Sequence, residues 1–417
     1  MAEPLRMMQW IDRQSAGLPS RLVPLANINS GSRNLLGLRQ AASWLVDYFA
    51  PLDAQFRTVD LPPREFVTDS GIVATAPAGQ LLRWDLHPDR PHRALLAIHY
   101  DTVFGEDSTF QQCAPQPDGR LSGPGVADAK GGIVVLHTAL SAWQACGGPA
   151  RVGWSVVLNP DEELGSPSSA GYLQSIAPEF DFGLLFEPAL PNGHLVGRRK
   201  GSGNFTVVVR GKAAHAGRHF HQGRNAVVLL AHLIVEIDRL NSQRPGATIN
   251  VGMVHGGTAV NIVPDIAVAR INARFSTAED VQWFEQALQG VLQAGRSQEG
   301  FAIELHGKVL SPPKLVTPAV EPLMRAVEQS HQRTGLGAIT WTETGGVCDG
   351  NKLAAAGLPN VDTLGPVGDG LHSDREWVLL ESLPAKAKVV ADLLARWDAG
   401  ELPELDRSRP AEQFEAS

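Results

Sequence analysis

Short apolar runs in the first half of the chain predict strands that are buried on both faces. They occupy residues 94–98, 152–158 and 182–186, and segments with helical apolar spacing lie at 35–49 and before Trp143. Runs of this length are typical of strands in a parallel sheet that is covered on both sides. Their alternation with helices predicts an α/β domain with a mostly parallel central sheet.

Acidic residues and histidines stand where these strands or nearby glycine-rich turns end. They are His99, Asp128, the pair Glu162-Glu163, Glu187 and His372. In open sheets of this type, ligands bind beyond the carboxyl ends of the strands. We therefore expect these side chains, which are far apart in the sequence, to converge on one face of the sheet.

The pattern changes near Lys200, where strand-like and helical segments follow the order β-α-β-β-α-β. These segments lie at residues 205–210, 225–240, 247–254, 265–275, 277–292 and 301–305. This order is that of a ferredoxin-like α+β unit. We expect residues 201–308 to form a small domain inserted into a larger one that comprises residues 1–200 and 309–417.

Composition restricts the classes of function. Hydrophobic residues make up 43% and charged residues 19% of the 417 residues, as in soluble globular proteins. The net charge of −8 argues against a nucleic-acid partner. The three cysteines have no paired spacing, and neither a secretory signal nor a membrane span stands out, so we expect a cytoplasmic protein.

The candidate residues have the composition of a two-metal hydrolytic site. Two adjacent carboxylates, Glu162 and Glu163, repel each other unless a cation is close. One of them can bind a metal while the other takes a proton from water. Each motif also has an ordinary explanation: an exposed acidic turn for this pair, a helix N-cap for Asp128, and a surface pair for His99 and Asp101.

As a set, the motifs resemble those of the dizinc metallopeptidases that include aminoacylase, acetylornithine deacetylase, succinyl-diaminopimelate desuccinylase and glutamate carboxypeptidase. The matching segments are His99-Tyr-Asp101, Gly123-Pro-Gly-Val-Ala-Asp128-Ala-Lys-Gly-Gly132, Asn159-Pro-Asp-Glu162-Glu163, Phe186-Glu187-Pro188, Gly211-Lys-Ala-Ala-His215 and His372-Ser-Asp374. They follow the family's order over nearly the whole chain, and the resemblance is greatest to the glutamate carboxypeptidase branch.

The resemblance implies a role for each ligand. Asp128 would bridge two zinc ions, with His99 and Glu187 completing one site and Glu163 and His372 completing the other. The ligand types suit manganese or cobalt as well. Glu162 would be the general base, Asp101 would orient His99, and the peptide bond between Asp128 and Ala129 would be cis.

The resemblance also assigns the inserted domain to dimerisation or to a lid over the site. His215 would reach the active site of a partner subunit and stabilise the oxyanion there. Asn261 and Arg274 match positions that hold the carboxylate of the substrate, and the turn at Gly345 and Gly346 matches a substrate-side turn. The chain departs from the family pattern after this turn, where it has Val347-Cys348-Asp349, and at the alanine that follows Asp128.

Taken together, these features predict a homodimeric zinc hydrolase that acts on a small peptide or an N-acyl amino acid. Its chemistry would combine a metal-bridging hydroxide with a glutamate base. A glutamate carboxypeptidase-like exopeptidase and an N-acyl-amino-acid deacylase of the acetylornithine deacetylase or aminoacylase type are the competing activities. A non-catalytic ligand-binding relative would lack a ligand or the base, and this chain has all of them.

Overall fold

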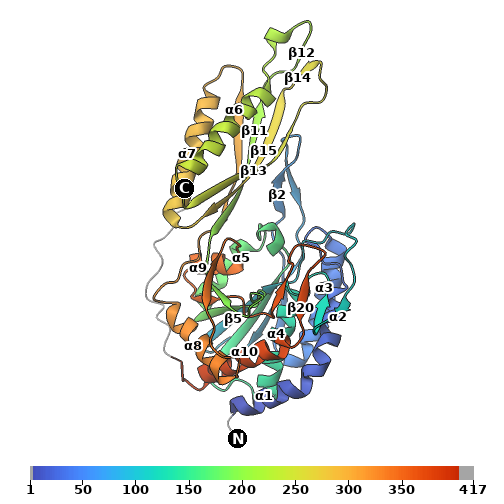
Figure 1. The fold of residues 1–417 in the computed structure, drawn as a ribbon, viewed down its shortest axis with the longest axis vertical. Coiled ribbons are helices and arrows are strands. Elements are labelled where there is room, and N and C mark those ends of the chain that lie inside the picture. The colour runs from blue at the N-terminus through green and yellow to red at the C-terminus, as the bar shows by residue number, and fades with distance from the viewer. Residues whose placement is uncertain (1–2, 403–417) are drawn as a thin grey trace.

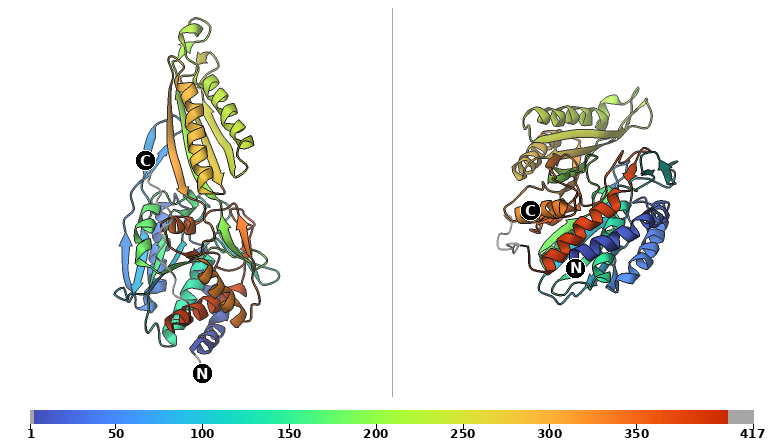
Figure 2. Two further views of the ribbon diagram at one scale, coloured as in Figure 1. Left: turned by 90° about the vertical axis from the view of Figure 1, so that its left-hand side faces the viewer. Right: turned by 60° about the horizontal axis from the view of Figure 1, so that its bottom comes forward.

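The computed structural model describes residues 3–402, and its two largest sheets lie at opposite ends of an elongated molecule (Figures 1 and 2). Residues 201–311 carry one of these sheets and are called the small unit below. The remaining described residues, 3–200 and 312–402, form the large unit.

The central sheet of the large unit is mixed. In spatial order, its strands are β1 (Gln55–Val59), β4 (Leu81–Leu86), β8 (Gly153–Asn159), β5 (Arg93–His99), β9 (Phe182–Leu185) and β18 (Asn360–Val361). The neighbours from β8 to β18 run parallel, which confirms the predicted mostly parallel arrangement. At the edge, β4 runs antiparallel to β8 and β1 runs antiparallel to β4, which the apolar pattern did not reveal.

Successive side chains of the central strands pack alternately into two separate cores. On β5, Leu96 and Ile98 pack into the larger core, while Leu95 and Ala97 pack into a smaller core on the other face. This alternation follows from the two-residue period of a strand. Helices cover both faces: α1 (Glu3–Gln14), α2 (Leu18–Ala26), α3 (Leu35–Phe49), α4 (Lys130–Ala145), α8 (Glu321–Arg333) and α10 (Ser382–Asp398) beside the larger core, and α5 (Ala170–Ile176) and α9 (Asp349–Ala355) beside the smaller one. Within residues 3–402, no helix has both the length and the hydropathy that a membrane crossing needs.

Short strands extend the large unit around its carboxyl-end face. They are the parallel pair β10 (Leu195–Arg199) and β17 (Trp341–Thr344), and the antiparallel group β19 (Gly368–Asp369), β20 (Trp377–Leu379), β7 (Arg120–Ser122) and β6 (Ala114–Gln116). The second group joins the segment after His372 to the segment before Asp128, although about 250 residues separate them in sequence.

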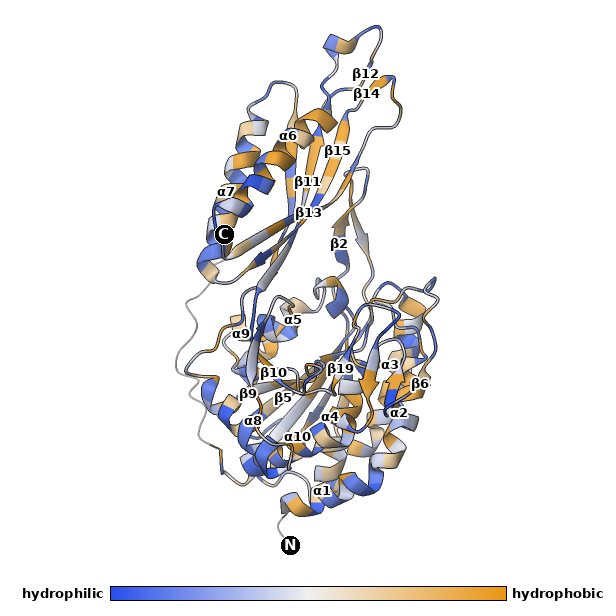
Figure 3. Ribbon diagram, in the orientation of Figure 1, coloured by the Kyte–Doolittle hydropathy of each residue, from blue (hydrophilic) through white to orange (hydrophobic). Residues whose placement is uncertain are grey.

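The small unit is an antiparallel sheet with two helices on one face. Its strands, in spatial order, are β13 (Ala247–Gly256), β15 (Ile266–Phe275), β11 (Gly201–Arg210) and β16 (Ala302–Ser311), and its helices are α6 (Ala226–Arg239) and α7 (Ala278–Arg296). The predicted β-α-β-β-α-β order is present. A capping box between Thr277 and Asp280 begins α7, as its spacing predicted. The hydrophobic residues of β11 and β15 are prominent in Figure 3 and pack with both helices into a separate core.

A two-stranded pair and a hairpin project from this framework. The short antiparallel strands β12 (Ala214–His215) and β14 (Ile262–Val263) form the far tip of the small unit (Figure 1). The hairpin, β2 (Arg64–Val67) and β3 (Val73–Ala76), rises from the large unit and packs Val67 against the small unit's sheet. Arg270 of that sheet donates to the carbonyl oxygen of Val67 at 2.8 Å and forms an ion pair with Asp69 at 2.6 Å.

Candidate metal centre

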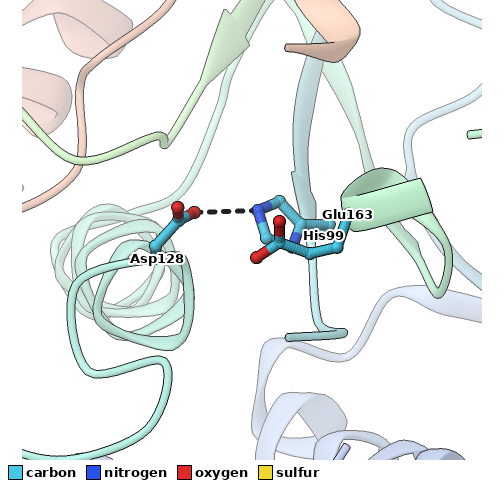
Figure 4. Close-up of side chains that lie close together, drawn as sticks. All are labelled: His99, Asp128 and Glu163. Carbon is cyan, nitrogen blue, oxygen red and sulfur yellow. Dashed lines mark hydrogen bonds and ion pairs between the residues drawn. The ribbon is translucent and has the colours of Figure 1, made fainter. Parts of the chain in front are cut away.

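Neighbouring strands deliver the candidate ligands to one edge of the central sheet. His99 is the last residue of β5, the turn after β8 carries Glu162 and Glu163, and Glu187 follows β9. Because β5 lies between β8 and β9 and runs parallel to both, these three strand ends meet at the same edge. Asp128 reaches the same place from the segment before α4, as Figure 4 shows for His99, Asp128 and Glu163.

Asp128 lies between two imidazoles. Its Oδ1 is 3.1 Å from Nε2 of His99, and its Oδ2 is 3.3 Å from Nε2 of His372. Each imidazole also has a carboxylate of its own, because Nε2 of His99 is 3.8 Å from Glu187 and Nε2 of His372 is 3.2 Å from Glu163. The cluster therefore has two halves that share one aspartate.

The cluster is buried on one side and open on the other. His99 is 1% exposed, whereas the side chain of His372 is 56% exposed. The backbone of His372 has a φ of +61°, in the left-handed region that is uncommon for residues with a side chain. Gly370 precedes it with a φ of +72°, and a Cβ there would lie 2.3 Å from the carbonyl oxygen of Arg375. The loop thus needs this glycine to bring His372 over the cluster.

The cluster has more negative charge than nearby cationic side chains neutralise. Burial raises the pKa of Glu163 to about 7, and the charge of Asp128 adds to this shift. Burial also raises the pKa of Glu162 and of Glu187. Across residues 3–402, no lysine or arginine forms an ion pair with these carboxylates or with Asp128, and Oε1 of Glu163 is buried without a hydrogen-bond partner.

The chemistry of this donor set fits divalent cations. Ligand atoms of His99, Asp128 and Glu163 all lie within 4.8 Å of one another. Hydrogen bonds to Asp128 and Glu163 raise the pKa of His372 to about 10. Imidazole nitrogens and carboxylate oxygens are the ligands that catalytic zinc sites use.

Asp101 connects the first histidine to the acidic turn. Nδ1 of His99 is 3.0 Å from the carbonyl oxygen of Asp101 and 3.4 Å from its carboxylate. That carboxylate also accepts the main-chain N–H groups of Glu162 at 3.1 Å and of Glu163 at 3.2 Å. Ser32 donates its hydroxyl to the same carboxylate at 2.6 Å. Asp101 therefore holds the acidic turn as well as the imidazole.

Glu376 was not identified from the sequence, and it holds the segment that carries Asp128. Its carboxylate accepts main-chain N–H groups from Gly125 at 2.9 Å, Ala127 at 2.8 Å and Asp128 at 3.0 Å. Glu376 is 1% exposed. The peptide bond between Asp128 and Ala129 is cis, as the family resemblance implied. A glutamate in a loop carries no periodic signal, so only the pairing of β20 with β7 reveals its position.

Asp349 is a second supporting residue whose role was not foreseen. It begins α9, is 2% exposed and accepts a hydrogen bond from the amide of Asn159 at 2.7 Å. It also accepts the hydroxyl of Ser166 and forms an ion pair with Lys352 at 3.0 Å. Asp349 thus fixes the turn after β8. It belongs to the segment after Gly346, where the chain departs from the family pattern.

The candidate substrate residues fall into two groups. Arg274 donates to the carbonyl oxygen of Gly345 at 3.3 Å, and Arg199 donates to that of Gly346 at 3.3 Å. Burial lowers the pKa of Arg274 while the charge of Glu162 opposes this shift, which places the guanidinium within electrostatic reach of the acidic turn. Arg274 of the small unit and the glycine turn of the large unit therefore lie together, within reach of the acidic turn.

His215 and Asn261 form the other group, at the far tip of the small unit. The N–H of Ala216 donates to the carbonyl oxygen of Asn261 at 2.9 Å, and His215 belongs to β12. Figure 1 shows this tip far from the end of β5 in the same chain. The structure thus brings the predicted ligands, Asp101 and Glu162 together, and it leaves His215 and Asn261 apart from them.

Comparison with known proteins agrees with this arrangement. The model of peptidase family M20/M25/M40 matches residues 95–396. A succinyl-diaminopimelate desuccinylase of Verminephrobacter eiseniae is 30% identical over 76% of this chain and 74% of its own length. Carboxypeptidase G2 of a Pseudomonas species is 28% identical over 73% of this chain and 74% of its own length.

A solved structure shares the fold despite low sequence identity. An M20 family metallo-carboxypeptidase from Sulfolobus solfataricus is 15% identical, with a TM-score of 0.74 over 92% of this chain and 99% of that one. The resemblance inferred from the motifs is confirmed, and with it the assignment as an enzyme. Since the family model spans most of its length, the chain belongs to peptidase family M20/M25/M40.

Proposed function

We propose that this hydrolase cleaves an amide or peptide bond next to an amino acid with a free carboxylate, as a glutamate carboxypeptidase-like exopeptidase. The observation that carries the proposal is the position of Asp128 between two imidazoles, each with its own carboxylate. Arg274, on the facing side of the small unit, supplies a cation for the substrate's carboxylate.

Two zinc ions suit the two halves of the cluster. Asp128 would bridge them, His99 and Glu187 would hold the first, and Glu163 and His372 would hold the second. When bound, such ions supply Lewis-acid polarisation of the scissile carbonyl and a lowered pKa for the attacking water. Manganese and cobalt use the same ligand types.

Glu162 is the proposed general base. It lies beside a metal ligand in the acidic turn, and within the described chain its carboxylate has no ion-pair partner, so both oxygens are free for water and substrate. Burial raises its pKa, which favours holding a proton after taking it from water. The same group would deliver that proton to the leaving amine.

Arg274 and His215 are proposed to act on the substrate. The guanidinium of Arg274 can grip a carboxylate with two donors. Nδ1 of His215 accepts the N–H of Gly217 at 3.1 Å, so the ring proton lies on Nε2, where it can be donated to an oxyanion. Because this tip lies far from the cluster of its own chain, we infer that His215 acts on a partner subunit.

A homodimer through the small unit would cover the exposed edge strand of its sheet. β13 is the edge strand of the sheet, and its Met253 and Val254 are 50% and 54% exposed. On the adjoining helix α6, Val228 and Val235 are 51% and 50% exposed. An unpaired edge strand beside apolar side chains is a surface that a second copy of the same sheet can cover.

An N-acyl-amino-acid deacylase is the second candidate. The observation in its favour is the 30% identity to a succinyl-diaminopimelate desuccinylase. Both activities hydrolyse an amide and leave a free amino acid, so they differ only in the group on the carbonyl side of the bond.

A substrate panel tests the proposal and separates the two candidates. Folyl-type and dipeptide conjugates of C-terminal glutamate, N-succinyl and N-acetyl amino acids, and the C-terminal amides of each would be assayed with zinc, manganese and cobalt. We expect turnover of carboxylate-bearing substrates and at least about 100-fold slower turnover of the amides, because one charged partner is lost. Arg274→Ala should erase that difference, whereas Arg325→Ala, on the exposed face of α8 in the large unit, should keep it. Equal turnover of acids and amides by the wild type would contradict the proposal.

Mixed dimers test the role of His215 across subunits. Glu162→Ala and His215→Ala homodimers should each be inactive. After subunit exchange, a mixed dimer has one intact active site if His215 acts in the partner, so activity should return. If activity does not return after exchange has been verified, His215 acts in its own chain or not at all.

A further inference from the structure

A cavity of about 420 Å³ lies in the large unit, away from the residues of the metal centre. It is lined by the end of α8, the start of α10 and the loops around His194 and Val367, and it is open to solvent on one side. Its apolar lining comes from Leu336, Ala338, Ile339, Val367 and Leu379. Leu336 is 42% exposed and marks the opening to solvent. This volume is within the range of small-molecule sites, about 300–1,000 Å³.

Two buried polar side chains line this cavity without the partners that burial normally requires. Lys386 is 3% exposed, and its ammonium has a single hydrogen bond, to the carbonyl oxygen of Gly193 at 3.5 Å. His331 is 2% exposed, and neither of its ring nitrogens has a hydrogen-bond partner. Among the described residues, no carboxylate forms an ion pair with Lys386, and Glu381, the acid in the lining, is exposed. Buried charges are normally paired, so the ammonium lacks an anion.

We propose that this cavity binds a small aliphatic carboxylate, with its anionic end on Lys386 and His331 and its chain against Leu336, Ile339 and Val367. The ammonium offers three donors, of which a carboxylate oxygen can take one or two as charge-assisted hydrogen bonds. The imidazole offers one N–H to the second oxygen. The apolar walls would remove the chain of the ligand from water.

The ionisation of the two groups is consistent with such a ligand. Burial lowers the pKa of Lys386 to about 8, so the side chain is still mainly an ammonium at pH 7. Burial and the nearby charge of Lys386 lower the pKa of His331 to about 3, so its ring is neutral and can donate one hydrogen. An amine ligand would meet repulsion from Lys386, and a neutral alcohol would leave the ammonium without a counter-charge.

The cavity also adjoins two segments that carry proposed metal ligands. Val367 pairs with Ala189, two residues after Glu187, and Gly365 donates to the carbonyl oxygen of Glu187 at 2.9 Å. The same loop continues to His372. The cavity is therefore connected to the segments of the metal ligands through Val367 and Gly365. Binding in the cavity does not depend on the reaction proposed above.

Calorimetric titration of the metal-loaded dimer with sodium hexanoate tests the inference. We expect saturable binding, at least about tenfold weaker binding to Lys386→Met, and none to Ala338→Trp, which adds a bulky ring to the apolar lining. Lys388→Met is the matched control, because Lys388 is on the same helix but pairs with Asp12 at 2.5 Å outside the cavity. It should bind hexanoate within about twofold of the wild type. Hexylammonium and hexanol should bind at least about tenfold more weakly than hexanoate.

Three outcomes would overturn the inference. The first is the absence of saturable hexanoate binding to the wild type. The second is equal binding to the wild type, Lys386→Met and Ala338→Trp, since the carboxylate would then be at the metal centre. The third is binding of hexanol as tight as that of hexanoate. Lys386→Met should fold at least as stably as the wild type because it removes an unpaired buried charge, and Ala338→Trp alters an exposed position.

Discussion

Replacement of Glu376 by glutamine should weaken both the fold and metal binding, although Glu376 is not among the proposed ligands. The glutamine carbonyl oxygen can keep the hydrogen bonds from Ala127 at 2.8 Å and Asp128 at 3.0 Å. Its amide NH₂ group then faces the N–H of Gly125, which now donates to a carboxylate oxygen at 2.9 Å. One charge-assisted hydrogen bond is lost and one buried donor has no acceptor.

The magnitude follows from these contacts. A hydrogen bond to a charged group contributes about 1.5–3 kcal/mol, and an unsatisfied buried donor costs a similar amount. The two effects overlap. Burial raises the pKa of Glu376 to about 7, so at pH 8, where the carboxylate is mainly ionised, we expect the free energy of unfolding of the metal-free protein to fall by about 2–4 kcal/mol. Asp128 is on the same segment, and loss of an outer-shell partner typically lowers metal affinity by about 10- to 100-fold.

Urea unfolding of the metal-free protein and zinc competition against a chromophoric chelator would measure the two effects. Glu321→Gln is the control, because Glu321 pairs with Arg325 on the solvent side of α8, with both side chains more than half exposed. Exposed pairs of this kind contribute less than about 1 kcal/mol. If Glu376→Gln matched this control in both measurements, the idea that Glu376 positions Asp128 would be refuted.

Three further predictions concern the base, a buried histidine and the metals. Glu162→Gln should lower kcat by about 10²- to 10⁴-fold while metal content, measured by mass spectrometry, stays at the wild-type level; activity within tenfold of wild type would exclude Glu162 as the base. Burial lowers the pKa of His137 to about 3, so the unfolded chain binds its proton first and stability should fall as the pH drops from 6.5 toward 3. His137→Phe, which keeps a ring against Tyr48, should flatten that dependence in urea titrations at pH 7 and pH 5, and an unchanged slope would count against it. Chelation should lower the Tm, because removal of a metal present at a hundredfold excess over its Kd costs about 2.7 kcal/mol of stability, and added zinc should restore it.

The location of the metal centre could be predicted from sequence because a local pattern determined it. The apolar runs before His99 and Glu187 indicated buried strands, and parallel strands place their carboxyl ends at one edge. The neighbour relations were not predictable from these runs. β5 lies between β8 and β9, and the edge strands β1 and β4 run antiparallel, because long-range packing decides the order of strands in a sheet.

The supporting residues could not be predicted, for the same physical reason. Glu376 and Asp349 act through hydrogen bonds to segments about 190–250 residues away in sequence. No periodicity links such partners, and a glutamate or aspartate in a loop usually faces solvent. The boundary of the inserted domain rests on the change of pattern near Lys200, and the roles of His215, Asn261 and Arg274 rest on the family resemblance.

The hairpin formed by β2 and β3 changes the mechanics of the molecule. The chain crosses between the two units near residues 200 and 312, and two crossings alone would leave the small unit free to pivot about the line that joins them. The hairpin touches the small unit away from that line, through Val67, the Asp69–Arg270 ion pair and a hydrogen bond from Arg210 to Gly71 at 2.7 Å. It therefore braces the small unit against the large one. Rotation of the small unit about that line would have to bend residues 64–76 or break these contacts.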